Sequence, residues 1–191
     1  RQFQYDGILL SAGGNDFIDA ARDPDPGKGL LLNMAGQQLP PDGYACVDQL
    51  AKGKLEDYLN RNFAQLMQAI RVAGSINQTT PVFVNCYDTP VARNAPAASG
   101  IGPWLYTAYL KNSIDTTLWQ ALTQGLFKDI SSVINGWSNL DNNLHVVPTT
   151  GVLAPADPKS PGSSADWANE IHPSASGWMK EARVWATALQ Q

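Results

Sequence analysis

Three short apolar runs, each bounded by turn-forming residues, predict three buried strands. They cover residues 7–11 (GILLS), 81–86 (PVFVNC) and 144–148 (LHVVP). None of the runs shows a sustained alternation of apolar and polar positions, which is typical of strands that are buried on both faces of a parallel sheet. We therefore expect parallel strands rather than hairpins.

Apolar residues at spacings of three and four predict an amphipathic helix after the first strand and another after the second, over residues 55–70 and 114–134. A third helix is expected after Ser174, which can cap it, with Trp178 and Trp185 on one face. The proline- and glycine-rich stretch 22–43 and the apolar stretch 91–112 are predicted to be irregular.

The order strand, helix, strand, helix, strand, helix predicts an α/β fold, an open parallel sheet with flanking helices and right-handed crossovers. We expect residues 1–191 to form a single domain. Three strands are few for this class, and the edges of such a sheet need protection. The pattern therefore suggests that strands are missing at the amino end.

Composition narrows the class of function. The 191 residues are 43% hydrophobic and 16% charged, with a formal net charge of −4, which is typical of a folded domain. No apolar stretch approaches the roughly 18 residues of a spanning helix, and no basic cluster is present to follow phosphates. We expect a soluble protein with a small-molecule ligand, no membrane span and no nucleic-acid partner. The sequence does not decide whether the protein is cytoplasmic, secreted or periplasmic.

The two cysteines, Cys46 and Cys86, fit neither a zinc knuckle nor a redox CxxC motif, because 40 residues separate them. The sequence leaves open whether they form a disulfide. It suggests no metal site and no organic cofactor.

Candidate chemistry follows the predicted strands, since ligands of open α/β sheets bind at the carboxyl ends of the strands. Gly13-Gly14-Asn15-Asp16 follows the first strand and Asp88 follows the second. Asn169-Glu170-Ile171-His172-Pro173 comes just before the last helix. His172 is the one histidine of the two that lies outside a predicted strand.

These segments together resemble the SGNH (GDSL-like) hydrolases over nearly the whole chain. The resemblance implies a flavodoxin-like three-layer fold, with the Asn15 side-chain amide in the oxyanion hole and His172 as the general base. The family's nucleophilic serine, in a Gly-Asp-Ser motif after its first strand, and its second oxyanion donor, a glycine, are not present. The resemblance therefore implies a domain that is incomplete at the amino end, with these segments upstream of Arg1.

A second departure concerns the acid that orients the histidine. The family pattern has an aspartate three residues before the histidine, where this chain has Asn169. Asp166 is the nearest aspartate and our candidate for this role, and a backbone carbonyl is the alternative. Glu170 is expected to face solvent or to make a structural contact.

The expected function is hydrolysis of a small-molecule, lipid or carbohydrate ester. Its catalytic residues would be Asn15, His172 and Asp166, with the serine supplied by an amino-terminal segment or a second chain that covers the sheet edge. Ser11 is interpreted as a strand-end hydroxyl rather than the nucleophile, because nothing around it resembles the nucleophile motif. The alternative is an inactive binding or scaffold module of the same fold.

Overall fold

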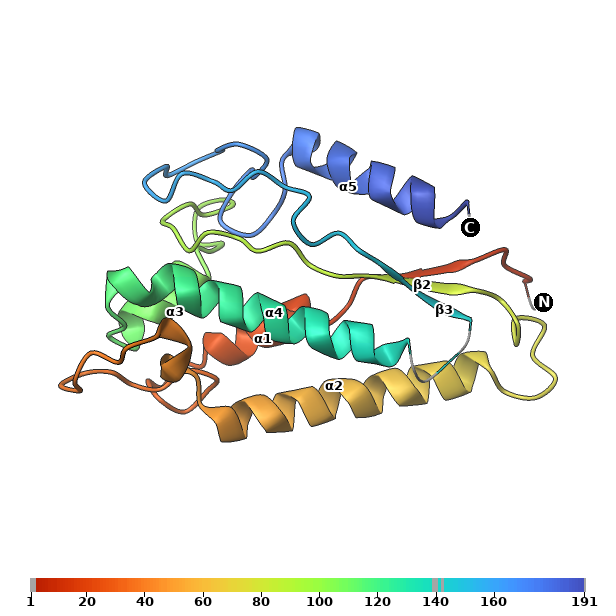
Figure 1. Ribbon diagram of the computed structural model, residues 1–191, viewed down its shortest axis with the longest axis horizontal. Helices are drawn as coiled ribbons and strands as arrows, with labels where there is room; N and C mark the ends of the chain where they lie inside the picture. Colours follow the sequence, from red (N-terminus) through yellow and green to blue (C-terminus); the bar gives the residue numbers. More distant parts are fainter. Residues whose placement is uncertain (1–2, 139–140, 142, 191) are drawn as a thin grey trace.

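A computed structural model describes residues 3–138, 141 and 143–190 (Figure 1). Arg1, upstream of which the missing segments are expected, lies outside these residues. The chain forms a parallel sheet of three strands in the order β1-β2-β3. The strands are β1 (Ile8–Leu10), β2 (Val82–Asn85) and β3 (Leu144–Val147). This confirms the predicted open parallel α/β sheet and the position of each strand.

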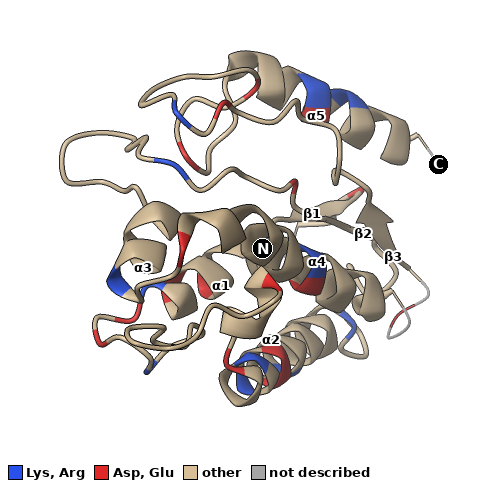
Figure 2. Ribbon diagram, turned by 60° about the vertical axis from the view of Figure 1, so that its left-hand side comes forward, with Lys and Arg blue, Asp and Glu red and all other residues tan. Residues whose placement is uncertain are grey.

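Helices cover both faces of the sheet. In Figure 1, α5 lies along one face, and α1, α2 and α4 lie on the other. The helices are α1 (Gly14–Ala21), α2 (Gln49–Ile70), α3 (Leu105–Lys111), α4 (Trp119–Trp137) and α5 (Ala175–Ala188), with the short 3-10 turns η1 (Gly43–Cys46) and η2 (Thr116–Leu118). Acidic and basic side chains are mixed along α2 (Figure 2).

Local capping explains where the long helices begin. The carboxylate of Asp48 accepts hydrogen bonds from the backbone N–H groups of Leu50 and Ala51, so α2 begins before the periodic apolar residues do. Ser174 caps α5 as expected, since its hydroxyl accepts a hydrogen bond from the Gly177 N–H at 3.3 Å. All three predicted helices are therefore confirmed, although α2 starts earlier than the predicted 55–70 and α4 starts and ends later than the predicted 114–134.

Two short helices were not predicted. Helix α1 follows the first strand directly, where we expected only a tight turn. Helix α3 lies inside the stretch 91–112, which was expected to be irregular, so that part of the prediction is wrong. Its first N–H groups bind the side chain of Glu170, far along the sequence. A cap supplied from such a distance leaves no local signal.

The main core lies between the sheet and helices α1, α2 and α4. β2 is the central strand, and all of its residues are buried. β1 is an edge strand, and Leu9 in its middle is 56% exposed. Cys46 and Cys86 are both buried and free. In the part of the chain that the structure describes, none of the helices combines the length and apolar character needed to span a bilayer.

Candidate functional site

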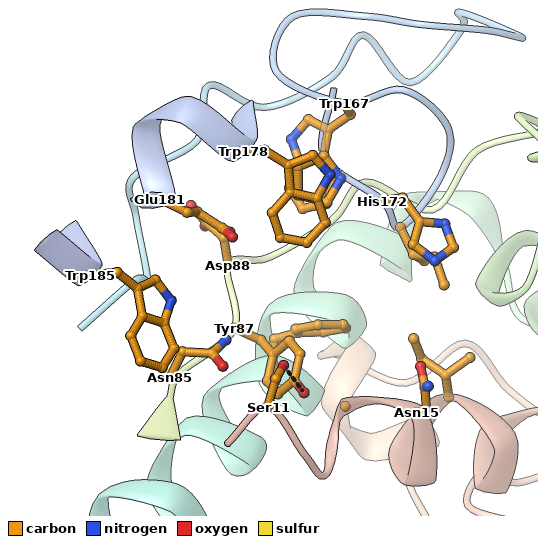
Figure 3. A pocket seen from close by; sticks show the side chains of 15 residues that line it. Ser11, Asn15, Asn85, Tyr87, Asp88, Trp167, His172, Trp178, Glu181 and Trp185 are labelled. Carbon is orange, nitrogen blue, oxygen red and sulfur yellow. Dashed lines mark hydrogen bonds between the residues drawn. The ribbon is translucent and has the colours of Figure 1, made fainter. Parts of the chain in front are cut away.

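A cavity of about 330 Å³ opens at the carboxyl ends of β1 and β2 (Figure 3). Helix α1 forms one wall, and the loop before α5 and α5 itself form the others. It therefore lies where open α/β sheets bind their ligands. The side chains labelled in Figure 3 are Ser11, Asn15, Asn85, Tyr87, Asp88, Trp167, His172, Trp178, Glu181 and Trp185.

Asn15 reaches this cavity from the first turn of α1. Gly13, just before the helix, has a φ of 98°, a conformation that strongly favours glycine. At Gly14 a Cβ atom would lie 2.7 Å from the Tyr87 ring, so the backbone is packed too closely on this ring for a larger residue. The Asn15 side chain is exposed and makes no hydrogen bond to another described residue. Its amide is free to donate to a ligand in the cavity.

His172 is held by Asn169. The side-chain oxygen of Asn169 accepts hydrogen bonds from the backbone N–H groups of Ile171 and His172, at 3.1 and 2.9 Å. These two donors identify that atom as the oxygen and not the amide nitrogen. The same oxygen lies 3.1 Å from Nδ1 of His172, so Nδ1 must carry the proton in this contact. Nε2 then carries the lone pair, which is the tautomer that a general base requires.

Asp166, the predicted orienting acid, is engaged elsewhere. Its carboxylate accepts hydrogen bonds from the Lys180 ammonium, from the Ala154 N–H at 2.7 Å and from the Ser176 hydroxyl at 3.4 Å. These contacts, the one with Lys180 foremost, lower the pKa of Asp166. The carboxylate thus fastens the loop before α5 to that helix. The orienting position beside the imidazole belongs to Asn169, and this replaces the prediction for Asp166.

Ser11 and Glu170 are placed as follows. The Ser11 hydroxyl lies 3.4 Å from that of Tyr87 and forms no hydrogen bond with His172. No base is therefore positioned to activate it, in line with its interpretation as a strand-end hydroxyl. Glu170 is completely buried and bonded to backbone N–H groups, so it makes a structural contact and does not face solvent.

Polar groups that the sequence analysis did not single out also line the cavity. The side-chain oxygen of Asn85 is buried and has no hydrogen-bond partner among the described residues. Glu181 is 8% exposed, and its pKa is raised by burial and, to a lesser degree, by the charge of Asp88. A usable signal for Glu181 existed, because it interrupts the apolar face that Trp178 and Trp185 define on α5.

Among the residues that the structure describes, no group of three or more histidine, cysteine, aspartate or glutamate side chains is arranged to hold a metal ion. The cavity walls are largely aromatic and aliphatic, with Ile18, Phe127 and Trp167 beside the two tryptophans of α5. The arrangement offers one free amide donor, one oriented imidazole and several acceptors around an apolar space.

The chain matches no family model, and comparison with the curated proteins and with the solved structures finds no match to it.

Proposed function

We propose that this chain is the carboxyl-terminal part of an SGNH-type ester hydrolase, with Asn15 in the oxyanion hole and His172 as the general base. The observation that carries the proposal is the pair formed by the oriented imidazole of His172 and the free amide of Asn15, which line one cavity at the end of a parallel sheet. The two backbone N–H donors identify the Asn169 atom as an oxygen, and its contact with Nδ1 then requires this tautomer.

The chemistry of acyl transfer fits these two groups. Nε2 of His172 would take the proton from a hydroxyl nucleophile and return it to the leaving alcohol. The Asn15 amide would donate a hydrogen bond to the carbonyl oxygen as it becomes negative, which is worth about 2.7–4 kcal/mol of barrier. A neutral asparagine beside the histidine is compatible with this scheme, because Cys-His-Asn sites use the same arrangement.

The nucleophilic serine would come from a segment outside the 191 residues, either upstream of Arg1 or on a second chain. The exposed edge of β1 supports this, because its backbone is free to pair with one further strand. A groove beside this edge is lined by Leu9, by Trp178 and Trp185 of α5, and by Leu189 just after that helix. A parallel strand added there would end at the cavity that His172 lines.

The substrate would be an ester of a small molecule, a lipid or a carbohydrate. The aromatic and aliphatic walls suit an acyl or other apolar group, and the acceptors Asn85, Asp88 and Glu181 suit a part of the substrate that carries hydroxyl groups. The apolar wall extends from Phe127 of α4 to Trp185 of α5.

The alternative is a binding or scaffold module that has the fold and no catalysis. It is favoured by one observation, the Ser11 hydroxyl without a base, if no other serine reaches the cavity. The two functions differ in whether any serine of the assembled protein reacts with an acylating probe.

Fluorophosphonate labelling tests the proposal. The probe would be applied to the 191-residue chain and to the product of the whole reading frame that encodes it, followed by peptide mapping. We expect one labelled serine outside the chain, and a loss of labelling of about 10⁴-fold in His172→Ala. His145→Ala, which removes the other histidine, should label normally, because His145 lies in β3 and not in the cavity lining.

Asn15→Ala provides the second arm. Ester turnover should fall by about 10²–10³-fold while the free energy of unfolding changes by about 0.5 kcal/mol or less, since the side chain is exposed. Labelling that survives in His172→Ala would overturn the role of His172. An assembled protein without any reactive serine would favour the binding module.

A further inference from the structure

Among the described residues around the site, Glu170 has the buried carboxylate with the most hydrogen bonds. Its carboxylate is fully buried and accepts hydrogen bonds from four backbone N–H groups, those of Arg93, Trp104, Leu105 and Tyr106. Burial raises the pKa of Glu170, and the four N–H donors act in the opposite direction. An ionised carboxylate is the side-chain group that satisfies four donors without bringing a hydrogen of its own.

Arg93 continues this connection in the other direction. Its side chain is 1% exposed, and its guanidinium donates to the backbone carbonyls of Ser160, Gly162 and Asn169, the last at 2.7 Å. Arg93 and Glu170 together therefore join the chain around residue 93, the start of α3, the loop near residue 160 and the turn that carries His172. We call these two side chains the buried clamp.

The buried clamp reaches His172 by two routes. Along the chain, it fixes both Asn169, through its carbonyl, and Glu170, so the turn that presents the Asn169 side chain to Nδ1 is held on each side. Through space, the N–H of Trp104 binds Glu170, and the Trp104 ring meets the His172 ring edge-on at a centroid distance of 5.3 Å. Within the clamp, Arg93 thus binds the residue that carries the orienting amide, and the Glu170 carboxylate, on the next residue, binds the backbone of the wall beside the imidazole.

We propose that Glu170 is a positioning residue for His172, which keeps the imidazole in the Nδ1-protonated tautomer by anchoring the turn that carries Asn169 to Trp104 and the start of α3. The inference rests on the proposed function in one respect, because the use of this tautomer in general-base catalysis belongs to that proposal. The tautomer itself is a property of the folded chain and is measurable without any ester chemistry.

The test is ¹⁵N NMR of the histidine rings of the 191-residue chain at alkaline pH, where neutral tautomers are distinguished. The chain has two histidines, so His145→Ala assigns the signals. Wild-type His172 should be almost entirely Nδ1-protonated. Glu170→Gln places an amide NH₂ against backbone N–H donors, and we expect a shift towards the Nε2-protonated form.

Two controls separate positioning from general loosening. Glu56→Gln makes the same chemical change on α2, where Glu56 pairs with Lys52, and should leave the tautomer unchanged. Leu126→Ala destabilises the core away from the clamp and should also leave it unchanged. A folded Glu170→Gln protein with the wild-type tautomer would overturn the proposal, and so would an equal shift in Leu126→Ala.

If Glu170→Gln does not fold, amide hydrogen exchange of the wild-type chain tests whether the clamp holds the histidine turn. The N–H groups of Trp104, Leu105 and Tyr106, which bind Glu170, should exchange at rates within about tenfold of those of Ile171 and His172, which bind Asn169, because one opening would release both sets. Much faster exchange at Ile171 and His172 would show that the clamp does not hold the histidine turn. Failure of the labelling experiment would leave both measurements interpretable.

Discussion

The helices on the two faces of the sheet bury their apolar residues to different degrees. Helix α4 buries Leu122, Leu126, Ile130 and Ile134, each at most 2% exposed, against the sheet and α2. Helix α5 lies on the opposite face (Figure 1), where Trp178 is 54% exposed and Leu189, just after the helix, is 46% exposed. Both helices show apolar residues at helical spacing, yet one apolar face is covered and the other is largely open.

The covered face and the open face contribute different features to the molecule. The α4 face provides the continuous core, whereas the open side of α5 provides the groove beside β1 and, together with α1 and Phe127 of α4, walls of the cavity. An exposed tryptophan, Trp178, in the wall of a cavity that also holds the unsatisfied oxygen of Asn85 is typical of a surface that meets a ligand or a further segment. The comparison predicts that substitutions on the two faces have effects of different size.

Leu126→Ala should have the largest effect on folding. The side chain is 2% exposed in the main core, so its truncation leaves a cavity and should lower the free energy of unfolding by about 2–5 kcal/mol. Urea denaturation of the 191-residue chain measures this value. A loss below about 1 kcal/mol would contradict the view that the α4 face holds the fold together.

Trp178→Ala should cost the isolated chain roughly 1 kcal/mol or less, although it removes a much larger side chain, because half of the ring is already in water. The same denaturation experiment applies. The contrast sharpens if a segment covers α5, since the substitution should then cost distinctly more in the assembled protein than in the chain alone. An equal cost in both would argue that nothing packs on Trp178.

Glu181→Gln should have the smallest effect, and its sign depends on pH. Because the pKa of Glu181 is raised in the folded chain, the folded state keeps the proton to a higher pH than the unfolded state does. The stability that protonated Glu181 contributes to the wild-type protein is therefore lost as pH rises from about 4.3 through the folded-state pKa. Glutamine removes this loss, so the variant should be more stable at pH 7 by about 1 kcal/mol or less.

Denaturation of wild type and Glu181→Gln at pH 4 and pH 7 provides the comparison. The stability difference between the two proteins should be small at the lower pH and larger at the higher one. A wild-type protein that is the more stable of the two at pH 7 would show that a partner group compensates the buried carboxylate.

The strands and the long helices were predictable because their signals are local. The three apolar runs, the periodic residues of α2 and α4 and the Ser174 cap each act within a few residues. Asn15 and His172 line the same cavity, Asn15 from the first turn of the helix after β1 and His172 from the loop before α5.

The remainder depends on contacts between distant segments. Helix α3 begins where Glu170 binds its N–H groups, and Asp166 turns away from His172 because Lys180 and Ala154 bind it. No spacing in the sequence encodes either contact. The contact of Asn169 was not predicted for another reason, because the resemblance implies an acid beside the histidine, whereas here an amide oxygen lies 3.1 Å from Nδ1.

The open edge of β1 also bears on how this chain behaves in concentrated solution. An unpaired strand edge is a template on which other chains can add strands and aggregate. The edge is protected here mainly by its brevity, since β1 spans only Ile8–Leu10 and Asp6 places a charge just before it. Lengthening this strand or replacing Asp6 with an apolar residue would turn a tolerable edge into an aggregation site.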